Sequence, residues 1–304
     1  MQISSYSTYA IGSFDMDNLQ SSIQQLQEQL DTQQRVNVPS DDPVAATQIL
    51  QLDQSSGRNS QFISNSQQAG SSLSFIDNSM MSASSLLSSM VSLAVQAGSG
   101  TIDASQLQMM QQQVNQDFNQ MIGYANTTNG RGEYLFGGNQ VGNPPFTADS
   151  NMNTTYNGDT GERVVQITDS SQVPVTQVGS QVFGNSTSPT AMFDSIQQLS
   201  QLLGQSTKPA NFSTQISGII SSLENAQTQL QDSQATVGAA EQQNTAVQSS
   251  DQNQTTLYQT AINNLQQLDL PQAISDYQMA QTSLQYSQLT YSKVTQLSLF
   301  NYLQ

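Results

Sequence analysis

The 304-residue chain carries 22 acidic and 6 basic residues, for a net charge of −16, and it has no histidine, cysteine or tryptophan. This charge balance disfavours nucleic acid and anionic membranes as partners, and the missing cysteines exclude disulfides and thiolate metal sites. Because histidine, the commonest metal ligand and general base, is also missing, we expect no catalytic residue, no metal and no cofactor.

No targeting segment is expected. No stretch approaches the roughly 18 apolar residues of a membrane span, and residues 1–14 have neither the basic start nor the apolar run of a cleavable signal peptide. The chain is therefore expected either to remain in the cytoplasm or to be exported by a machine that reads no such peptide.

The first predicted helix ends near Asn37, because Pro39 and Pro43 disfavour its continuation. Its first 14 residues carry no charge and hold several large apolar side chains. Four leucines and isoleucines then follow at 4–3–4 spacing, which is typical of a helix with one apolar face: Leu19, Ile23, Leu26 and Leu30.

Ser40-Asp41-Asp42-Pro43 is typical of a helix start, because an aspartate N-cap accepts free amides and proline presets the first turn. We assign Asp41, Asp42 and Pro43 to this helix cap motif rather than to a catalytic carboxylate pair, since adjacent residues there point apart. The helix is expected to run to about Ala97 as a rod of roughly 80 Å. Its apolar residues recur in steps of four and three, typical of a helical seam: Ala69, Leu73, Ile76, Met80, Ala83, Leu87, Met90, Ala94 and Ala97.

A shorter helix is predicted through Leu107–Ala125. The glycines that follow it and Pro144-Pro145 indicate that the helical pattern ends there. Residues 138–188 lose the helical period and gain β-branched residues, which indicates a small inserted β domain. The acidic residues of this insert match no calcium-binding loop and are interpreted as solvated: Asp149, Asp159, Glu162 and Asp169.

Helix is predicted again at 191–205, then in a second rod over about 210–268, and after Pro271 in a last helix over 272–304. The second rod carries a matching seam: Phe212, Ile216, Ile219, Leu223, Ala226, Leu230, Ser233, Val237, Ala240, Asn244 and Val247. Asn244 is open to two interpretations, a tolerated polar residue or a residue that fixes the register of the two rods.

The elements are symmetric about the insert, so the simplest packing is antiparallel, rod against rod and terminal helix against terminal helix. The expected fold class is mainly α, with long antiparallel helical rods in a coiled-coil bundle and a small inserted β domain. Three domains are expected: a terminal helical assembly domain (1–37 with 272–304), a helical rod domain (38–137 with 189–271) and the β insert (138–188).

The last helix carries apolar residues around much of its circumference, and such a helix needs neighbours on several sides. We therefore predict that the two ends of the chain form an assembly interface with other molecules. Its residues are Ile3, Tyr6, Tyr9, Ile11, Phe14, Leu19, Ile23, Tyr277, Leu284, Tyr291, Val294, Leu297, Leu299, Phe300, Tyr302 and Leu303.

Three motifs resemble the bacterial flagellin superfamily. Arg35-Val-Asn with Ser40–Ala46 resembles the N-terminal motif of that superfamily, and Ser292–Leu303 resembles the C-terminal motif. Gly132–Asn139, before a single compact insert, resembles the hook-associated branch, whose members join the flagellar hook to the filament. One departure is Gln2, where relatives usually carry arginine.

The resemblance implies a structural, non-enzymatic subunit that is exported without a cleavable signal peptide and assembles as a ring in the extracellular flagellum. Its implied partners are further copies of itself, the first hook-associated protein, flagellin, and an export chaperone before secretion. Two alternatives stay open: a filament-forming flagellin, and a secreted adhesin or enzyme whose active part is the β insert.

Overall fold

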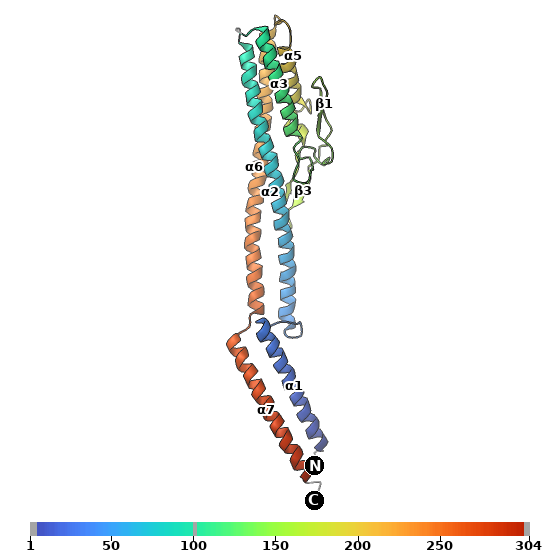
Figure 1. The fold of residues 1–304 in the computed structure, drawn as a ribbon, viewed down its shortest axis with the longest axis vertical. Helices are drawn as coiled ribbons and strands as arrows, with labels where there is room; N and C mark the ends of the chain where they lie inside the picture. Colours follow the sequence, from blue (N-terminus) through green and yellow to red (C-terminus); the bar gives the residue numbers. More distant parts are fainter. Residues whose placement is uncertain (1–4, 100–101, 301–304) are drawn as a thin grey trace. The chain divides into compact units, whose positions relative to one another are not determined.

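The computed structural model describes residues 5–99 and 102–300 of the chain. Within the described residues the chain forms two compact units, residues 5–58 with 254–300 (unit 1) and residues 59–99 with 102–253 (unit 2). The long helices α2 (Pro43–Gly98) and α6 (Phe212–Gln266) each contribute to both units. The predicted fold class, a mainly helical chain with a small strand region, is confirmed (Figure 1). The expected domain boundaries at 37/38 and 271/272 differ from this division, which falls inside the two long helices.

Unit 2 is built around an antiparallel pairing of α2 with α6. Ser88 Oγ accepts a hydrogen bond from Gln227 Nε2 at 2.8 Å, and Ser66 O accepts one from Asn244 Nδ2 at 2.9 Å, so residues later in α2 meet residues earlier in α6. All nine predicted seam residues of α2 are fully buried. Each buried leucine or isoleucine in such a seam contributes about 1.5–3 kcal/mol.

The seam also explains a feature of α2 that the sequence interpretation missed. Among the helices of the described residues, α2 alone is long and apolar enough to span a membrane, judged by length and composition only. Its most apolar stretch of 18 residues has a mean hydropathy of 1.3. The expectation that no stretch reaches this threshold is therefore wrong. Seam leucines and methionines alternate with weakly polar serines rather than charges, which raises the mean hydropathy although a third of the window is buried.

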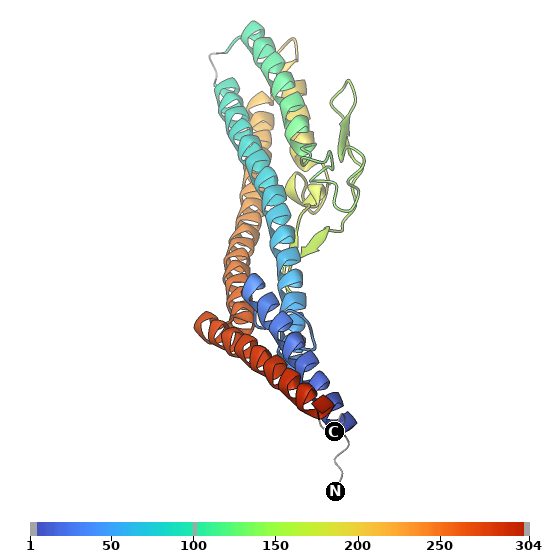
Figure 2. The ribbon, with the colours of Figure 1, turned by 60° about the horizontal axis from the view of Figure 1, so that its bottom comes forward.

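Helices α3 (Ala104–Ala125) and α5 (Ala191–Leu203) complete the helical part of unit 2 and lie side by side (Figures 1 and 2). A capping box starts α3: Asp103 Oδ1 accepts from the Gln106 amide at 2.8 Å, and Gln106 Oε1 accepts from the Asp103 amide at 3.1 Å. Phe118 of α3 and Phe193 of α5 meet edge-on, with ring centroids 6.0 Å apart. This pair extends the core from the seam toward the insert.

The insert contains two antiparallel hairpins, β1 (Phe146–Ala148) with β2 (Thr154–Tyr156), and β3 (Val164–Gln166) with β4 (Gln172–Pro174). A single helical turn, α4 (Gly179–Val182), follows. Because each strand is only three residues long, side-chain packing rather than a continuous sheet holds the insert. Phe136, Phe146, Phe183 and Phe193 form one aromatic cluster with Tyr156, with neighbouring centroids 5.0–5.8 Å apart.

The Gly132–Asn139 motif is the segment that anchors this insert. Glu133 accepts a hydrogen bond from Arg163 Nη1 at 2.9 Å, which, with Asn129, lowers the pKa of that carboxyl. Leu135 and Phe136 are fully buried. Gly138 has a positive φ of 68°, and a side chain there would collide with the Asp159 carboxylate, so glycine is required.

Two of the four acidic residues of the insert, Asp149 and Asp159, organise separate loops. The Asp149 carboxylate accepts the amides of Asn151 and Asn153, and the Asp159 carboxylate accepts those of Asn139 and Gly161. Within residues 5–99 and 102–300, no group of three or more acidic side chains is close enough to hold a metal ion.

Unit 1 contains α1 (Ser5–Thr32) and α7 (Leu270–Phe300), which lie side by side and antiparallel, together with the start of α2 and the end of α6 (Figures 1 and 2). Helix α1 ends at Thr32, five residues earlier than expected. Gln33 adopts φ 57°, a left-handed conformation that terminates helices, and Gln34 then pairs with Gln267 as an isolated β-bridge.

Candidate assembly interface

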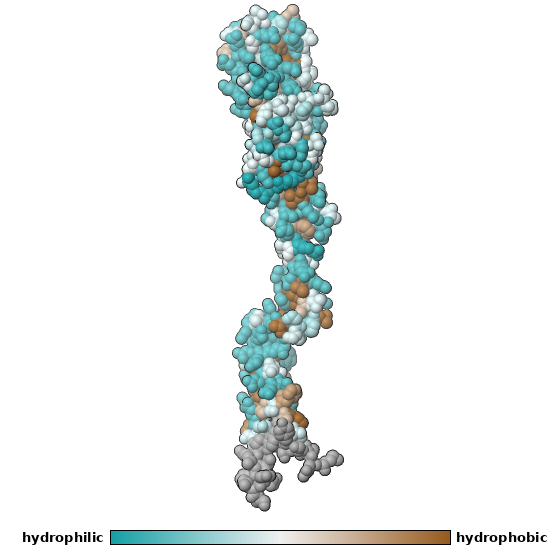
Figure 3. Space-filling model, turned by 90° about the vertical axis from the view of Figure 1, so that its right-hand side faces the viewer, coloured by the Kyte–Doolittle hydropathy of each residue, from teal (hydrophilic) through white to brown (hydrophobic). Residues whose placement is uncertain are grey.

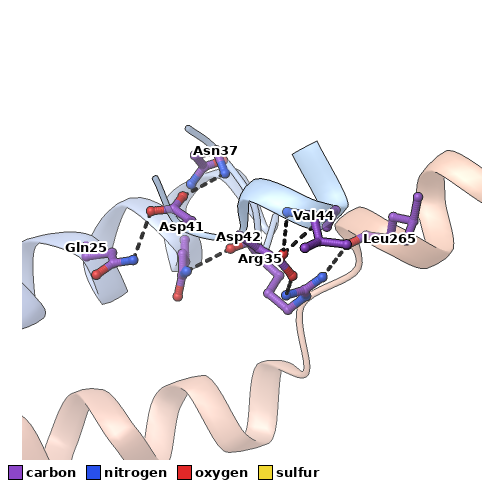
Figure 4. Close-up of polar contacts among 9 residues, drawn as sticks. Gln25, Arg35, Asn37, Asp41, Asp42, Val44 and Leu265 are labelled. Carbon is purple, nitrogen blue, oxygen red and sulfur yellow. Dashed lines mark hydrogen bonds and ion pairs between the residues drawn. The ribbon is translucent and has the colours of Figure 1, made fainter. Parts of the chain in front are cut away.

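Arg35 is the centre of the joint between the helices of unit 1 (Figure 4). Its Nη1 donates to Asp42 Oδ2 at 2.8 Å and its Nη2 donates to Leu265 O at 3.0 Å, while its backbone amide donates to Gln266 O at 2.7 Å. The last carbonyls of a helix have no partner within that helix. Arg35 therefore caps the end of α6 and simultaneously binds the start of α2.

The predicted helix cap motif has two separate roles. Asp42 is the N-cap of α2, because its Oδ1 accepts the amides of Val44 at 3.1 Å and Ala45 at 3.0 Å. The Ala45 amide and the Arg35 guanidinium both lower the pKa of the Asp42 carboxyl. Asp41 instead organises the preceding loop, where its Oδ2 accepts the amides of Asn37 and Val38 (Figure 4).

Asp41 also connects this loop to α1, since its Oδ1 accepts a hydrogen bond from Gln25 Nε2 at 2.9 Å. Below the loop lies a small apolar core of four buried residues: Val36, Ala45, Ile49 and Ile262. The Arg35–Ala46 motif thus folds into one compact joint that α1, α2 and α6 share.

The predicted interface residues of α1 and α7 fall into two groups. Tyr277, Leu284 and Tyr291 are half-buried on α7, as are Leu19 and Ile23 on α1. A Cβ placed on Gly12 would lie 3.1 Å from the Tyr291 ring, so the absence of a side chain at Gly12 makes room for that tyrosine. Tyr291 therefore packs against α1.

The second group is exposed. Ile11 is 61% exposed and Phe14 is 64% exposed on α1, and no described part of the chain covers them. Helix α7 carries a similar face that the predicted set omitted: Ile274, Met279, Tyr286 and Leu289 are 46–67% exposed. In Figure 3, hydrophobic patches interrupt an otherwise hydrophilic surface.

The role of these residues in assembly stays a prediction, and the structure describes the side chains of only part of the set. Ile3, Tyr302 and Leu303 lie outside the described residues, and for Tyr6, Tyr9, Val294, Leu297, Leu299 and Phe300 the structure describes only the helical backbone. The exposed face of α7 was recoverable from sequence, because Met279, Tyr286 and Leu289 follow a spacing of seven and three.

Comparison with known proteins agrees with this architecture. Residues 3–141 match the family model for the bacterial flagellin N-terminal helical region. The chain is 26% identical over 318 residues to flagellar hook-associated protein 3 of Salmonella typhimurium, with 99% of each chain covered. The resemblance to flagellar hook-associated protein 3 is confirmed. A second hook-associated protein 3, from Escherichia coli K12, is 25% identical over 188 residues, which cover 62% of this chain and 58% of that protein.

Solved structures share the fold of this chain. A putative flagellar hook-associated protein from Vibrio parahaemolyticus superposes with a TM-score of 0.68 at 16% identity, covering 75% of this chain and all of that one. The flagellar junction protein FlgL from Legionella pneumophila gives 0.61 at 16% identity, covering 72% of this chain and all of that one. At these identities the structures establish the fold alone.

Proposed function

We propose that this chain is a structural subunit at the junction between the flagellar hook and filament, and that it assembles as a ring through α1 and α7. The single observation that carries the proposal is that α1 and α7 each carry exposed apolar side chains, on a chain similar along its whole length to hook-associated protein 3. Exposed apolar side chains gathered on one side of a helix mark an interaction surface.

The proposed partners are a second copy of the chain, the first hook-associated protein, flagellin and an export chaperone. Export without a cleavable signal peptide and residence in the extracellular flagellum belong to the same proposal. Covering the interface before assembly would protect the exposed face from non-specific aggregation, which is the physical role proposed for the chaperone.

We also propose that the chain is not an enzyme. Its composition supports this, because a chain without histidine or cysteine lacks the side chains that most often act as general base or activated nucleophile near neutral pH. The relatives described above are named as hook-associated and junction proteins of the flagellum, and neither name denotes an enzyme.

The test is a pair of substitutions on α7 in a strain that lacks the native gene. Tyr286→Asp places a charge in the exposed face, whereas Gln281→Asp places the same charge toward its edge. We expect Tyr286→Asp to abolish incorporation and to release flagellin into the medium, while Gln281→Asp retains motility. Normal motility and filament retention with Tyr286→Asp would contradict the proposed interface.

A filament-forming flagellin is the second candidate, because the matched family model describes flagellin itself. Growth of long fibres from the purified chain alone would favour it. A junction subunit is expected to stop at small assemblies under the same conditions.

A further inference from the structure

A groove of about 620 Å³ lies in unit 1 between the start of α2 and the end of α6. Its floor is formed by Leu52, Ala261 and Leu265, and its rim is formed by uncharged polar residues: Gln48, Gln51, Ser55 and Asn264.

The walls of this groove are held in place by the joint. The carbonyl of Leu265 accepts from Arg35 Nη2 at 3.0 Å, and Ile49 and Ile262 are buried beneath the walls in the small core. A preformed groove binds a ligand without a further ordering cost. One exposed leucine, Leu257, lies one helical turn before Ala261 on the same side of α6, at 61% exposure.

We infer that this groove receives helix α7 of a second copy of the chain. The inference rests on the proposed function and deepens it by assigning a receptor surface to the exposed face of α7. In that face Met279 and Tyr286 are separated by two helical turns, about 10.5 Å, and Gln48 and Ser55 on the groove have the same separation. The arrangement is that of an amphipathic helix laid into an apolar groove.

Charge favours α7 over α1 as the helix that the groove receives. From Tyr277 to Ser292, α7 has no charged residue, so it meets the uncharged groove without burying an ion. The exposed face of α1 includes Phe14 next to Asp15 and close to Asp17, and burying these carboxylates without a cationic partner would be costly. Helix α7 is free to use this face, since it contacts α1 through the side that carries Tyr291.

The test uses the absence of cysteine from the chain. Gln51→Cys on the rim and Thr282→Cys on the exposed α7 face are made in separate chains, one of them tagged, and the two are co-expressed in the strain lacking the native gene. Isolated flagella are then treated with oxidised glutathione. A disulfide between differently tagged chains is necessarily intermolecular, and it requires Cα atoms within about 7 Å.

The matched control replaces Thr282→Cys with Gln281→Cys, one residue earlier and therefore about 100° around the helix. We expect the 51–282 pair to form a disulfide at least about tenfold more than the 51–281 pair, because only the first is brought within bonding distance. Equal yields for the two pairs, or no 51–282 disulfide in flagella that contain both chains, would overturn the inference.

A second pair of variants covers the case in which a cysteine variant fails to incorporate. Gln51→Glu introduces a carboxylate at the groove, and Gln54→Glu introduces the same carboxylate on the exposed part of α2 outside it. Incorporation is expected to fall at least about tenfold with Gln51→Glu and to be unchanged with Gln54→Glu. Equal incorporation of the two would contradict the groove assignment.

Failure of the proposed function has a different signature. If the unmodified chain is missing from isolated flagella and its deletion leaves filaments attached, the junction role itself is wrong. If the chain is incorporated normally but the groove variants have no effect, only the groove assignment is wrong.

Discussion

Two glycine-to-alanine substitutions, one expected to lower and the other to raise the free energy of unfolding, test the packing of unit 2. Gly179 lies under the aromatic cluster, where an added Cβ would meet Phe136 O at 2.5 Å, the Phe146 ring at 2.7 Å and the Tyr156 ring at 2.9 Å. Because one of these contacts is backbone, the neighbours have little room to move. Gly218, in the exposed part of α6, would have no atom within 4 Å of an added Cβ.

We expect Gly179→Ala to lower the free energy of unfolding of unit 2 by about 1–3 kcal/mol, the usual cost of overpacking. Gly218→Ala should raise it by about 0.5–1 kcal/mol, because alanine loses less conformational freedom in a helix. For units of this size, 1 kcal/mol corresponds to about 2–4 °C in Tm.

The assay is thermal unfolding of the full chain, followed by far-UV circular dichroism for the helices and near-UV circular dichroism for the aromatic cluster. Gly179→Ala is expected to lower the near-UV transition temperature, and Gly218→Ala is expected to raise the far-UV one. An unchanged or higher Tm for Gly179→Ala would refute the close approach of α4 to the aromatic rings.

Three further predictions concern the seam, the joint and pH. Leu87→Ala should lower the free energy of unfolding by about 2–5 kcal/mol in chemical denaturation, because Leu87 is buried in the seam. Leu257→Ala, at an exposed site, should change it by no more than about 0.5 kcal/mol, and equal effects of the two substitutions would contradict the buried seam. Asp42→Ala should speed amide exchange in the first turn of α2, as measured by mass spectrometry, and Asp53→Ala should not; slow exchange in both would argue against the cap. Burial raises the pKa of Asp251, so the folded chain binds a proton at this carboxyl more tightly than the unfolded chain does. The free energy of unfolding should therefore rise as pH falls from 7 through the raised pKa. Asp251→Asn should remove this rise, and a pH profile that the substitution leaves unchanged would contradict the prediction.

The helical part of the fold was largely predictable because its signal is local and periodic. Every seam residue of α2 from Ala69 to Ala97 is buried as its spacing predicted. Asn244 shows a feature that spacing alone could not decide. Its Nδ2 donates to Ser66 O across the seam, and it lies 3.0 Å from where a Cβ on Gly70 would stand, which favours the interpretation that it fixes the register.

The insert and the groove were less predictable because they depend on contacts between distant residues. Tyr156 is positioned by Gly179, whose amide donates to the tyrosine hydroxyl at 3.2 Å, and neither residue signals the other in sequence. The groove arises where Leu52 of α2 meets Leu265 of α6. The end of α1 was misplaced because the prolines set only the latest possible end, whereas the left-handed backbone at Gln33 ends the helix first.

The central claim is that the exposed apolar side chains of α1 and α7 are buried on assembly. Its most direct measurement is the maleimide labelling rate of Tyr286→Cys in the free chain and in isolated flagella, with Ser170→Cys, an exposed loop position of the insert, as the reference. The account predicts that labelling at position 286 is fast in the free chain and strongly suppressed in flagella, while labelling at position 170 changes little. Equally fast labelling at position 286 in both states would contradict it.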